Sequence, residues 1–291
     1  MFKGSLVAIV TPFKDDKIDW DSFEKLIEFH IEKGTNAIVP CGTTGESATL
    51  SPEEHKKVIE FVVEKAAGRI PIVAGTGSNS TKEAIILTKE AEENGVDGCL
   101  LIAPYYNKPT QEGLFQHFSA VAKEVSIPLI LYNIPSRTGI NMLPSTVQRL
   151  ASEHKNIVGI KEASGSLAQM QEIIRICPSD FVLLSGDDAL LLPVLSIGGK
   201  GVISVVANIV PERVVRIIEL FEKGDIEEAR KLNYELLPLV NAMFYETNPI
   251  PVKKALALMG MINDQLRLPL VSMSDENTAK LKEKMKSAGI I

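Results

Sequence analysis

Eight short apolar segments recur along the first two-thirds of the chain, and they constrain the fold more than any other feature. They are residues 6–10, 37–40, 72–74, 98–103, 129–132, 157–161, 181–184 and 202–206. Most are continuous hydrophobic runs rather than alternations of apolar and polar residues. Strands that are buried on both faces have this pattern, so we expect a parallel sheet covered by helices.

Helical patterns lie between these segments. In residues 21–33, four side chains fall on one face of a helix, opposite the charges: Phe23, Leu26, Ile27 and His30. The Ser-Pro-Glu-Glu run from Ser51 to Glu54 begins a second helix, with a serine cap, proline at the first helical position and glutamate at the third. Ser80 and Glu83 predict a further capping box.

Eight strands, each followed by a helix and with no Pro-, Gly- or Ser-rich linker, predict a closed (β/α)8 TIM barrel. A doubly wound open sheet is the alternative, because a strand count cannot prove closure. The chain has 291 residues, and the last 65 or so are helical beyond what a barrel needs, over 226–245, 249–260 and 275–287. We therefore expect a barrel over 1–225 and a C-terminal helical extension over 226–291, packed on it as one structural unit.

The composition excludes several classes of protein. The formal net charge of −6 argues against a nucleic-acid partner, which would need a basic face. No apolar stretch has the length of a membrane span, and the N-terminus lacks the pattern of a signal peptide. The three cysteines are far apart and odd in number, which favours a reducing, cytoplasmic location over a disulfide framework.

Lys161 is the most informative candidate, because the active sites of such barrels lie at the carboxyl ends of the strands. It ends an apolar strand, so its amine points into a poorly hydrated mouth. Desolvation lowers the pKa of an amine, and the neutral amine is the nucleophile that attacks a ketone. The alternative is a lysine paired with a carboxylate such as Glu162; position alone does not separate the two.

Other polar residues follow neighbouring strands. Tyr132 could relay protons, or be a core tyrosine with a satisfied hydroxyl. Thr43 and Thr44 lie in a glycine-bracketed loop that could hold a carboxylate or a phosphate, although it lacks the Gly-Lys-Ser/Thr of a P-loop. Arg137 suits an anionic substrate group, or a surface salt bridge.

The sequence does not favour a metal site, and we expect no cofactor. The four histidines are scattered, without His-Glu-x-x-His or Cys-x-x-Cys spacing. Asp187 and Asp188 could be ligands, but an acidic pair that opens a helix is more simply explained as a cap. A metal-dependent aldolase is therefore less favoured than one that uses a lysine Schiff base.

Seven motifs in order give the chain a family resemblance. They are VAIVTP (7–12), GTTGE (42–46), YYNKP (105–109), YNIPSRTG (132–139), GIKEA (159–163), NPIPVK (248–253) and LRLPL (266–270). Together they resemble the dihydrodipicolinate synthase (4-hydroxy-tetrahydrodipicolinate synthase) family of the N-acetylneuraminate lyase superfamily, along essentially the whole chain. The resemblance implies a lyase of lysine and diaminopimelate biosynthesis that condenses pyruvate with L-aspartate 4-semialdehyde, usually as a homotetramer.

The resemblance also implies catalytic residues. Lys161 would condense with pyruvate. Thr44, Tyr132 and Tyr106 would form a proton relay, with Tyr106 reaching across from a neighbouring subunit. For substrate binding, it implies that Thr43 and Thr44 contact the pyruvate carboxylate and that Arg137 binds the carboxylate of the semialdehyde.

Two further residues, Gly186 and Ile203, would shape the pocket around the Schiff base. Feedback inhibition by L-lysine at a subunit interface is a further implication of the resemblance. The matching positions are Ser47, Ala48, His55, Asn79, Glu83 and Tyr105. Pro52 stands where some lysine-sensitive relatives carry a polar side chain, and it reads as the first residue of its helix.

Three alternative functions stay open on the sequence. One is another lyase of the superfamily, acting on N-acetylneuraminate or a 2-keto-3-deoxy sugar acid, against which Arg137 argues. The second is a phosphate-binding barrel, for which Gly198-Gly199-Lys200-Gly201 is a candidate cradle, although it precedes the last strand. The third is an inactive barrel kept as a binding scaffold, against which an intact Lys161 argues.

Overall fold

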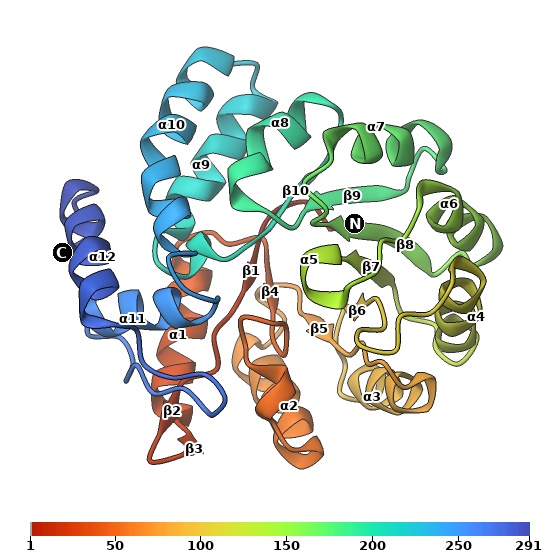
Figure 1. The fold of residues 1–291 in the computed structure, drawn as a ribbon, viewed down its shortest axis with the longest axis horizontal. Coiled ribbons are helices and arrows are strands. Elements are labelled where there is room, and N and C mark those ends of the chain that lie inside the picture. Colours follow the sequence, from red (N-terminus) through yellow and green to blue (C-terminus); the bar gives the residue numbers. More distant parts are fainter. Residues whose placement is uncertain (1) are drawn as a thin grey trace.

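The computed structural model describes residues 2–291, and eight parallel strands form its central sheet in the order β4-β1-β10-β9-β8-β7-β6-β5 (Figure 1). Their bounds are β1 Gly4–Ala8, β4 Ala37–Val39, β5 Val73–Gly75, β6 Gly98–Ile102, β7 Leu129–Asn133, β8 Ile157–Glu162, β9 Val182–Ser185 and β10 Gly201–Ser204. All eight predicted strands are confirmed, with ends that differ by one or two residues.

The two end strands of this order, β4 and β5, are joined, and this closes the barrel. Ile38 and Ile72 form a parallel bridge. On either side of it, the Ile38 amide donates to the Pro71 carbonyl over 2.9 Å, and the Gly75 amide donates to the Pro40 carbonyl over 2.9 Å. The predicted TIM barrel is therefore confirmed, and the open doubly wound sheet is wrong.

Helices follow the strands and surround the barrel (Figure 1). They are α1 Trp20–Glu32, α2 Pro52–Ala66, α3 Thr81–Glu93, α4 Gln111–Ala122, α6 Pro144–Glu153, α7 Leu167–Ile176, α8 Leu191–Ser196 and α9 Pro211–Glu222, with the short α5 Pro135–Thr138 between β7 and α6. Short 3-10 turns are η1 Ser47–Thr49, η2 Asp188–Leu190 and η3 Val206–Asn208. Over the described residues, no helix combines the length and apolarity needed to cross a membrane.

A small antiparallel hairpin, β2 Phe13–Lys14 and β3 Lys17–Ile18, was not expected from the sequence. Its turn residues Asp15 and Asp16 both have left-handed backbones, with φ of 52° and 60°. Such turns are usually marked by Asn-Gly or Asp-Gly. An Asp-Asp turn between two-residue strands carries no comparable signal.

The predicted helix starts are confirmed at α2 and only partly at α3. Ser51 and Glu54 form the full capping box. At α3, the Ser80 hydroxyl accepts a hydrogen bond from the Glu83 amide, but the Glu83 carboxylate accepts from the Ser78 hydroxyl instead of closing the box. The second capping box is therefore wrong, because a competing donor captures the glutamate.

Two apolar cores hold the barrel together. The interior of the barrel is filled by side chains from the strands, including Leu6, Tyr132 and Ile203. A larger core lies between the sheet and the surrounding helices. On α1 the four predicted side chains are all buried, namely Phe23, Leu26, Ile27 and His30, and the first three belong to this core. A filled interior leaves the mouth of the barrel as the place for a site.

Three further helices follow the barrel: α10 Ile226–Ala242, α11 Ile250–Leu258 and α12 Asp275–Ser287. α10 contacts α9 and α12, and α11 contacts α12 and η3 (Figure 1). The predicted helices of the extension are confirmed, whereas the boundary between 225 and 226 stays a prediction. The segment that enters α11 reaches the mouth of the barrel, and this gives the extension a part in the site.

Candidate active site

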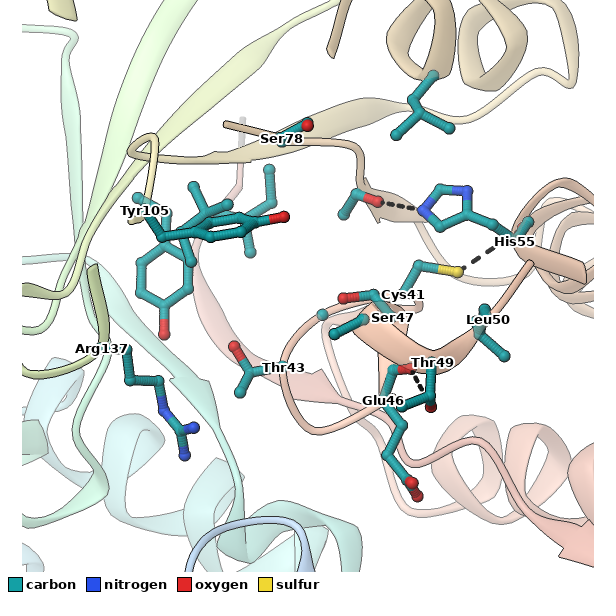
Figure 2. Close-up of a pocket in the computed structure, with 18 of the residues that line it drawn as sticks. Cys41, Thr43, Glu46, Ser47, Thr49, Leu50, His55, Ser78, Tyr105 and Arg137 are labelled. Carbon is teal, nitrogen blue, oxygen red and sulfur yellow. Dashed lines mark hydrogen bonds between the residues drawn. The ribbon is translucent and has the colours of Figure 1, made fainter. Parts of the chain in front are cut away.

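A cavity of about 870 Å³ opens at the carboxyl ends of the strands. Its walls come from the β4–α2 loop, from β6, β7 and β8, and from the segment before α11. Four of the predicted catalytic and substrate-binding residues line it: Thr43, Tyr132, Arg137 and Lys161. Figure 2 shows the Thr43 hydroxyl and the Arg137 guanidinium on one side of this cavity, with Ser78 and His55 on the other.

Lys161 lies at the end of β8 and is only 6% exposed. It is in register with Tyr132 on β7, and its Nζ lies 4.2 Å from the centre of the Tyr132 ring. Lys161 therefore has a phenol beside it and the cavity in front of it. This is the arrangement that nucleophilic attack on a carbonyl requires.

Glu162 does not partner Lys161. Successive residues of a strand point to opposite faces, so Glu162 lies on the helix side of β8. There its carboxylate is buried and accepts hydrogen bonds from Asn133 Nδ2 over 3.0 Å, Gln169 Nε2 over 3.1 Å and the Ser164 amide over 2.7 Å. Within residues 2–291 no ion pair joins the two side chains, so the alternative reading of Lys161 is wrong.

Gly186 makes the space that the lysine side chain needs. A Cβ atom at this position would lie 2.6 Å from Ala163 Cβ and 3.1 Å from Lys161 Cε. Any larger residue would clash with Ala163 and crowd the lysine side chain. Ile203 is buried in the barrel interior together with Tyr132. Gly186 therefore adjoins Lys161, whereas neither Gly186 nor Ile203 lines the cavity itself.

The loop after β4 carries the two threonines. Thr43 lines the cavity, whereas Thr44 is buried, with 2% of its surface exposed. The loop is held from below, because the Thr11 hydroxyl donates to the Gly45 carbonyl over 2.7 Å. The start of this loop also packs closely against the end of β5. A Cβ at Gly75 would lie 2.3 Å from the Cys41 carbonyl oxygen, so a side chain at Gly75 would displace the loop.

Arg137 comes from α5 and is exposed at the rim of the cavity. Its Nη2 donates to the main-chain carbonyl of Asn248 over 3.1 Å. In the described part of the chain it forms no salt bridge, so the surface-pair alternative is wrong. Its remaining donors are available to an anion in the cavity (Figure 2).

Tyr106 lies apart from the other candidates. It is 89% exposed, has a left-handed backbone with φ of 71°, and does not line the cavity of its own chain. An isolated chain therefore brings Lys161, Tyr132 and the Thr43–Thr44 loop together but leaves Tyr106 outside.

Asn248 is a residue of the site to which the sequence assigned no role. Its Nδ2 donates to the Thr44 hydroxyl oxygen over 2.9 Å, and its main-chain carbonyl accepts from Arg137. The next turn of chain carries Lys253, whose Nζ lies 2.6 Å from Glu46 Oε1 in a fully buried ion pair. Asn248 and Lys253 stand in one motif, but their partners Thr44 and Glu46 are more than 200 residues away.

The positions matched to lysine binding lie at the other end of the same cavity. Five of them line it: Ser47, Ala48, His55, Glu83 and Tyr105. The sixth, Asn79, does not, and its carbonyl accepts from Asn107. His55 Nε2 lies 2.9 Å from the Gly75 carbonyl oxygen, and burial lowers the pKa of this imidazole. Pro52 is the first residue of α2, as expected.

The acidic pair after β9 has structural partners. Asp187 accepts a hydrogen bond from the Ala189 amide as the cap of η2. Asp188 is buried and accepts from the Val205 and Val206 amides, and its burial raises the pKa of the carboxyl. No cluster of three or more metal-ligating side chains occurs within residues 2–291.

The glycine-rich segment before β10 does not form a phosphate cradle. The Lys200 amide donates to the Leu183 carbonyl over 2.8 Å, and the Gly199 amide donates to the Val194 carbonyl over 2.9 Å. These amides are used within the barrel, at the end away from the cavity. The phosphate-binding alternative is wrong for this segment.

The closed barrel and the lysine at the end of β8 define a class of protein, the class I aldolase-type lyases. More closely, the chain belongs to the dihydrodipicolinate synthetase family, whose model matches residues 1–288. A 4-hydroxy-tetrahydrodipicolinate synthase from Thermodesulfovibrio yellowstonii is 60% identical over 100% of both chains. The predicted family is confirmed.

Solved structures agree with this assignment. The dihydrodipicolinate synthase from Aquifex aeolicus is 51% identical, with a TM-score of 0.98 over 99% of each chain. The enzyme from Acinetobacter baumannii, complexed with pyruvate, is 49% identical, with a TM-score of 0.97 over 100% of each chain. The enzyme from Cyanidioschyzon merolae, with lysine bound, is 44% identical, with a TM-score of 0.98 over 100% of this chain and 99% of the other.

Proposed function

We propose that this chain condenses pyruvate with L-aspartate 4-semialdehyde to give 4-hydroxy-tetrahydrodipicolinate, the committed step of the diaminopimelate route to lysine, with Lys161 as the Schiff-base residue. The relatives named above support the reaction. The observation that carries the residue assignment is the Lys161 amine, 4.2 Å from the Tyr132 ring at the floor of the cavity. The lysine pathway supports a cytoplasmic enzyme.

The chemistry follows from the amine. Lys161 attacks the ketone of pyruvate, water leaves, and an imine forms. The imine accepts electrons, so the methyl group of pyruvate loses a proton and becomes an enamine. The enamine carbon attacks the aldehyde of the second substrate. The amino group of that substrate then attacks the imine carbon, which closes the ring and releases Lys161.

Each of these steps moves a proton near neutral pH, for which a free tyrosine is poorly matched. A chain of hydroxyls offsets that mismatch, and we assign Thr44 and Tyr132 to it, with Tyr106 from a second subunit. Thr43, at the cavity wall, and Thr44 are suited to hold the pyruvate carboxylate through hydroxyl and amide donors. Gly186 and Ile203 complete the pocket around Lys161.

Arg137→Ala should remove most activity with aspartate 4-semialdehyde while pyruvate still forms its imine. A charge-assisted hydrogen bond to a carboxylate is worth about 1.5–3 kcal/mol, so we expect kcat/KM for the semialdehyde to fall roughly ten- to a hundredfold. Steady-state kinetics with each substrate varied in turn measures this. Arg175→Ala, on exposed α7, is the matched control.

The same assay tests the substrate itself. If the wild-type protein cleaves N-acetylneuraminate faster than it consumes the semialdehyde, the substrate assignment is wrong, and the role of Arg137 with it.

We also propose a homotetramer built as a dimer of dimers, because Tyr106 can serve the relay only if a second subunit delivers it. The exposure of Tyr106, and the fact that it does not line the cavity of its own chain, support this. We expect sedimentation velocity to give a dimer or larger at assay concentration, and Tyr106→Phe to lower kcat. A fully active monomer would contradict the proposal.

Feedback inhibition by L-lysine is a further proposal. The cavity end lined by His55 and Glu83 offers an imidazole and a carboxylate to an amino acid, and a solved relative carries lysine. Because coupling between sites is reciprocal, pyruvate should change the affinity for lysine. We expect millimolar L-lysine to lower the steady-state rate. An unchanged rate with no heat of binding in calorimetry would mean that these residues are only structural.

A further inference from the structure

Asn248 contacts two of the proposed site residues, Thr44 and Arg137. It is 5% exposed and belongs to the segment that precedes α11. Its side-chain Nδ2 donates to Thr44 Oγ1, and its main-chain carbonyl accepts from Arg137 Nη2. A residue of the C-terminal extension therefore links the proton relay to the binder of the second carboxylate.

The direction of the hydrogen bond to Thr44 has a chemical consequence. An amide NH₂ group only donates, so Thr44 Oγ1 must accept. The proton of the Thr44 hydroxyl is then free to be donated elsewhere, and the proposed relay needs that donation. The Asn248 Oδ1 atom has no hydrogen-bond partner within residues 2–291, so Thr44 is the one described contact that orients this amide.

The segment that carries Asn248 is fixed by the buried ion pair of Lys253 and Glu46. The Lys253 amide donates to the Pro249 carbonyl over 3.0 Å, which ties the lysine to the segment. Its Nζ binds Glu46 Oε1, and Glu46 is two residues after Thr44 on the loop. The other carboxylate oxygen, Oε2, accepts from the Arg267 amide over 3.1 Å. In Figure 2 the Glu46 side chain extends away from Ser47 and His55.

We propose that Asn248 is a positioning residue: its amide sets the direction of the Thr44 hydroxyl, and the Lys253–Glu46 pair holds that amide in place. The proposal rests on the proposed function, because the hydroxyl matters only if Thr44 transfers a proton. It assigns no contact between Asn248 and substrate.

Asn248→Asp is the sharpest test, because it changes an NH₂ group to an oxygen at nearly constant size. The Thr44 hydroxyl must then donate its proton to the aspartate and is lost to the relay. We expect kcat to fall about tenfold to a hundredfold. The KM for the semialdehyde should change little, since Arg137 binds the main-chain carbonyl, which the substitution keeps. Asn241→Asp, exposed on α10, should behave as wild type.

A double-mutant cycle with Thr44→Val separates positioning from a general structural role. Without a hydroxyl to orient, Asn248→Asp should reduce kcat no further in the Thr44→Val background. If the two substitutions instead reduce kcat by independent factors, or if Asn248→Asp equals the Asn241→Asp control, the proposal is wrong. Should Asn248→Asp fail to fold, Asn248→Ala enters the same cycle with the same expectation.

The positioning role of Asn248 and the proposed function can fail independently of each other. A wild-type protein that neither traps pyruvate with borohydride nor consumes the semialdehyde overturns the function. A wild-type protein that does both, with no coupling between positions 44 and 248, overturns only the positioning role.

Discussion

Borohydride added with pyruvate should inactivate this protein and leave a reduced pyruvyl adduct on Lys161. Reduction converts the imine to a stable secondary amine, so the adduct records the covalent step. Lys161→Ala removes the amine at the cavity floor and should lower kcat at least about a thousandfold, because covalent catalysis is lost rather than weakened. Peptide mass mapping and steady-state kinetics measure the two effects.

Lys253 is the internal control for that experiment, because it is as deeply buried as Lys161 but bound to a carboxylate. Its amine is fully enclosed and paired with Glu46, so it should carry no adduct. An adduct on Lys253, or the absence of an adduct on any lysine, would contradict the mechanism. Chelator should leave activity intact; a loss that a divalent ion restores would revive the metal-dependent alternative.

Lys253→Met should destabilise the fold by about 3–5 kcal/mol, because it leaves the Glu46 carboxylate buried without its cation. The ion pair has side-chain exposures of 0% and 1%, so water cannot take over the lost contact. Burial lowers the pKa of Lys253, and the adjacent Glu46 opposes that shift. Urea denaturation of the wild type and the variant measures the difference.

The neighbouring lysine provides a matched control. Lys254 binds Asp264 over the same 2.6 Å, but the two side chains are 24% and 30% exposed. Since a partly solvated pair contributes little, Lys254→Met should cost less than about 1 kcal/mol. Removing both charges, with Glu46→Gln and Lys253→Met together, should recover much of the lost stability. Equal costs for Lys253→Met and Lys254→Met would contradict this account.

The period of the sequence alone was enough to predict the barrel. Continuous apolar runs can be satisfied only by strands buried on both faces, and each is followed by a helix. The same reasoning identified Lys161 and Tyr132, because the active sites of such barrels lie at the carboxyl ends of the strands. The site candidates at strand ends could therefore be found without coordinates.

Local sequence patterns predicted the structure less well where two hydrogen-bond donors competed for the same side chain. Ser80 predicted a capping box with Glu83, and the structure gives the glutamate to Ser78 instead. Both choices satisfy the same carboxylate, and only the path of the loop decides between them. The Asp15–Asp16 turn was not predicted for a different reason. Its backbone is left-handed, but it lacks the glycine that usually marks such a turn.

The sequence by itself determined the eight strands that alternate with helices, the family and the strand-end residues Lys161 and Tyr132, because all of these depend on local periodicity and short motifs. Only the tertiary structure decided barrel closure, the hydrogen-bond partners of Glu162, and the contacts of Asn248 and Lys253 with the Thr44–Glu46 loop. These depend on which segments meet in space, some of them about 200 residues apart in the chain, and no local preference of the residues encodes that meeting.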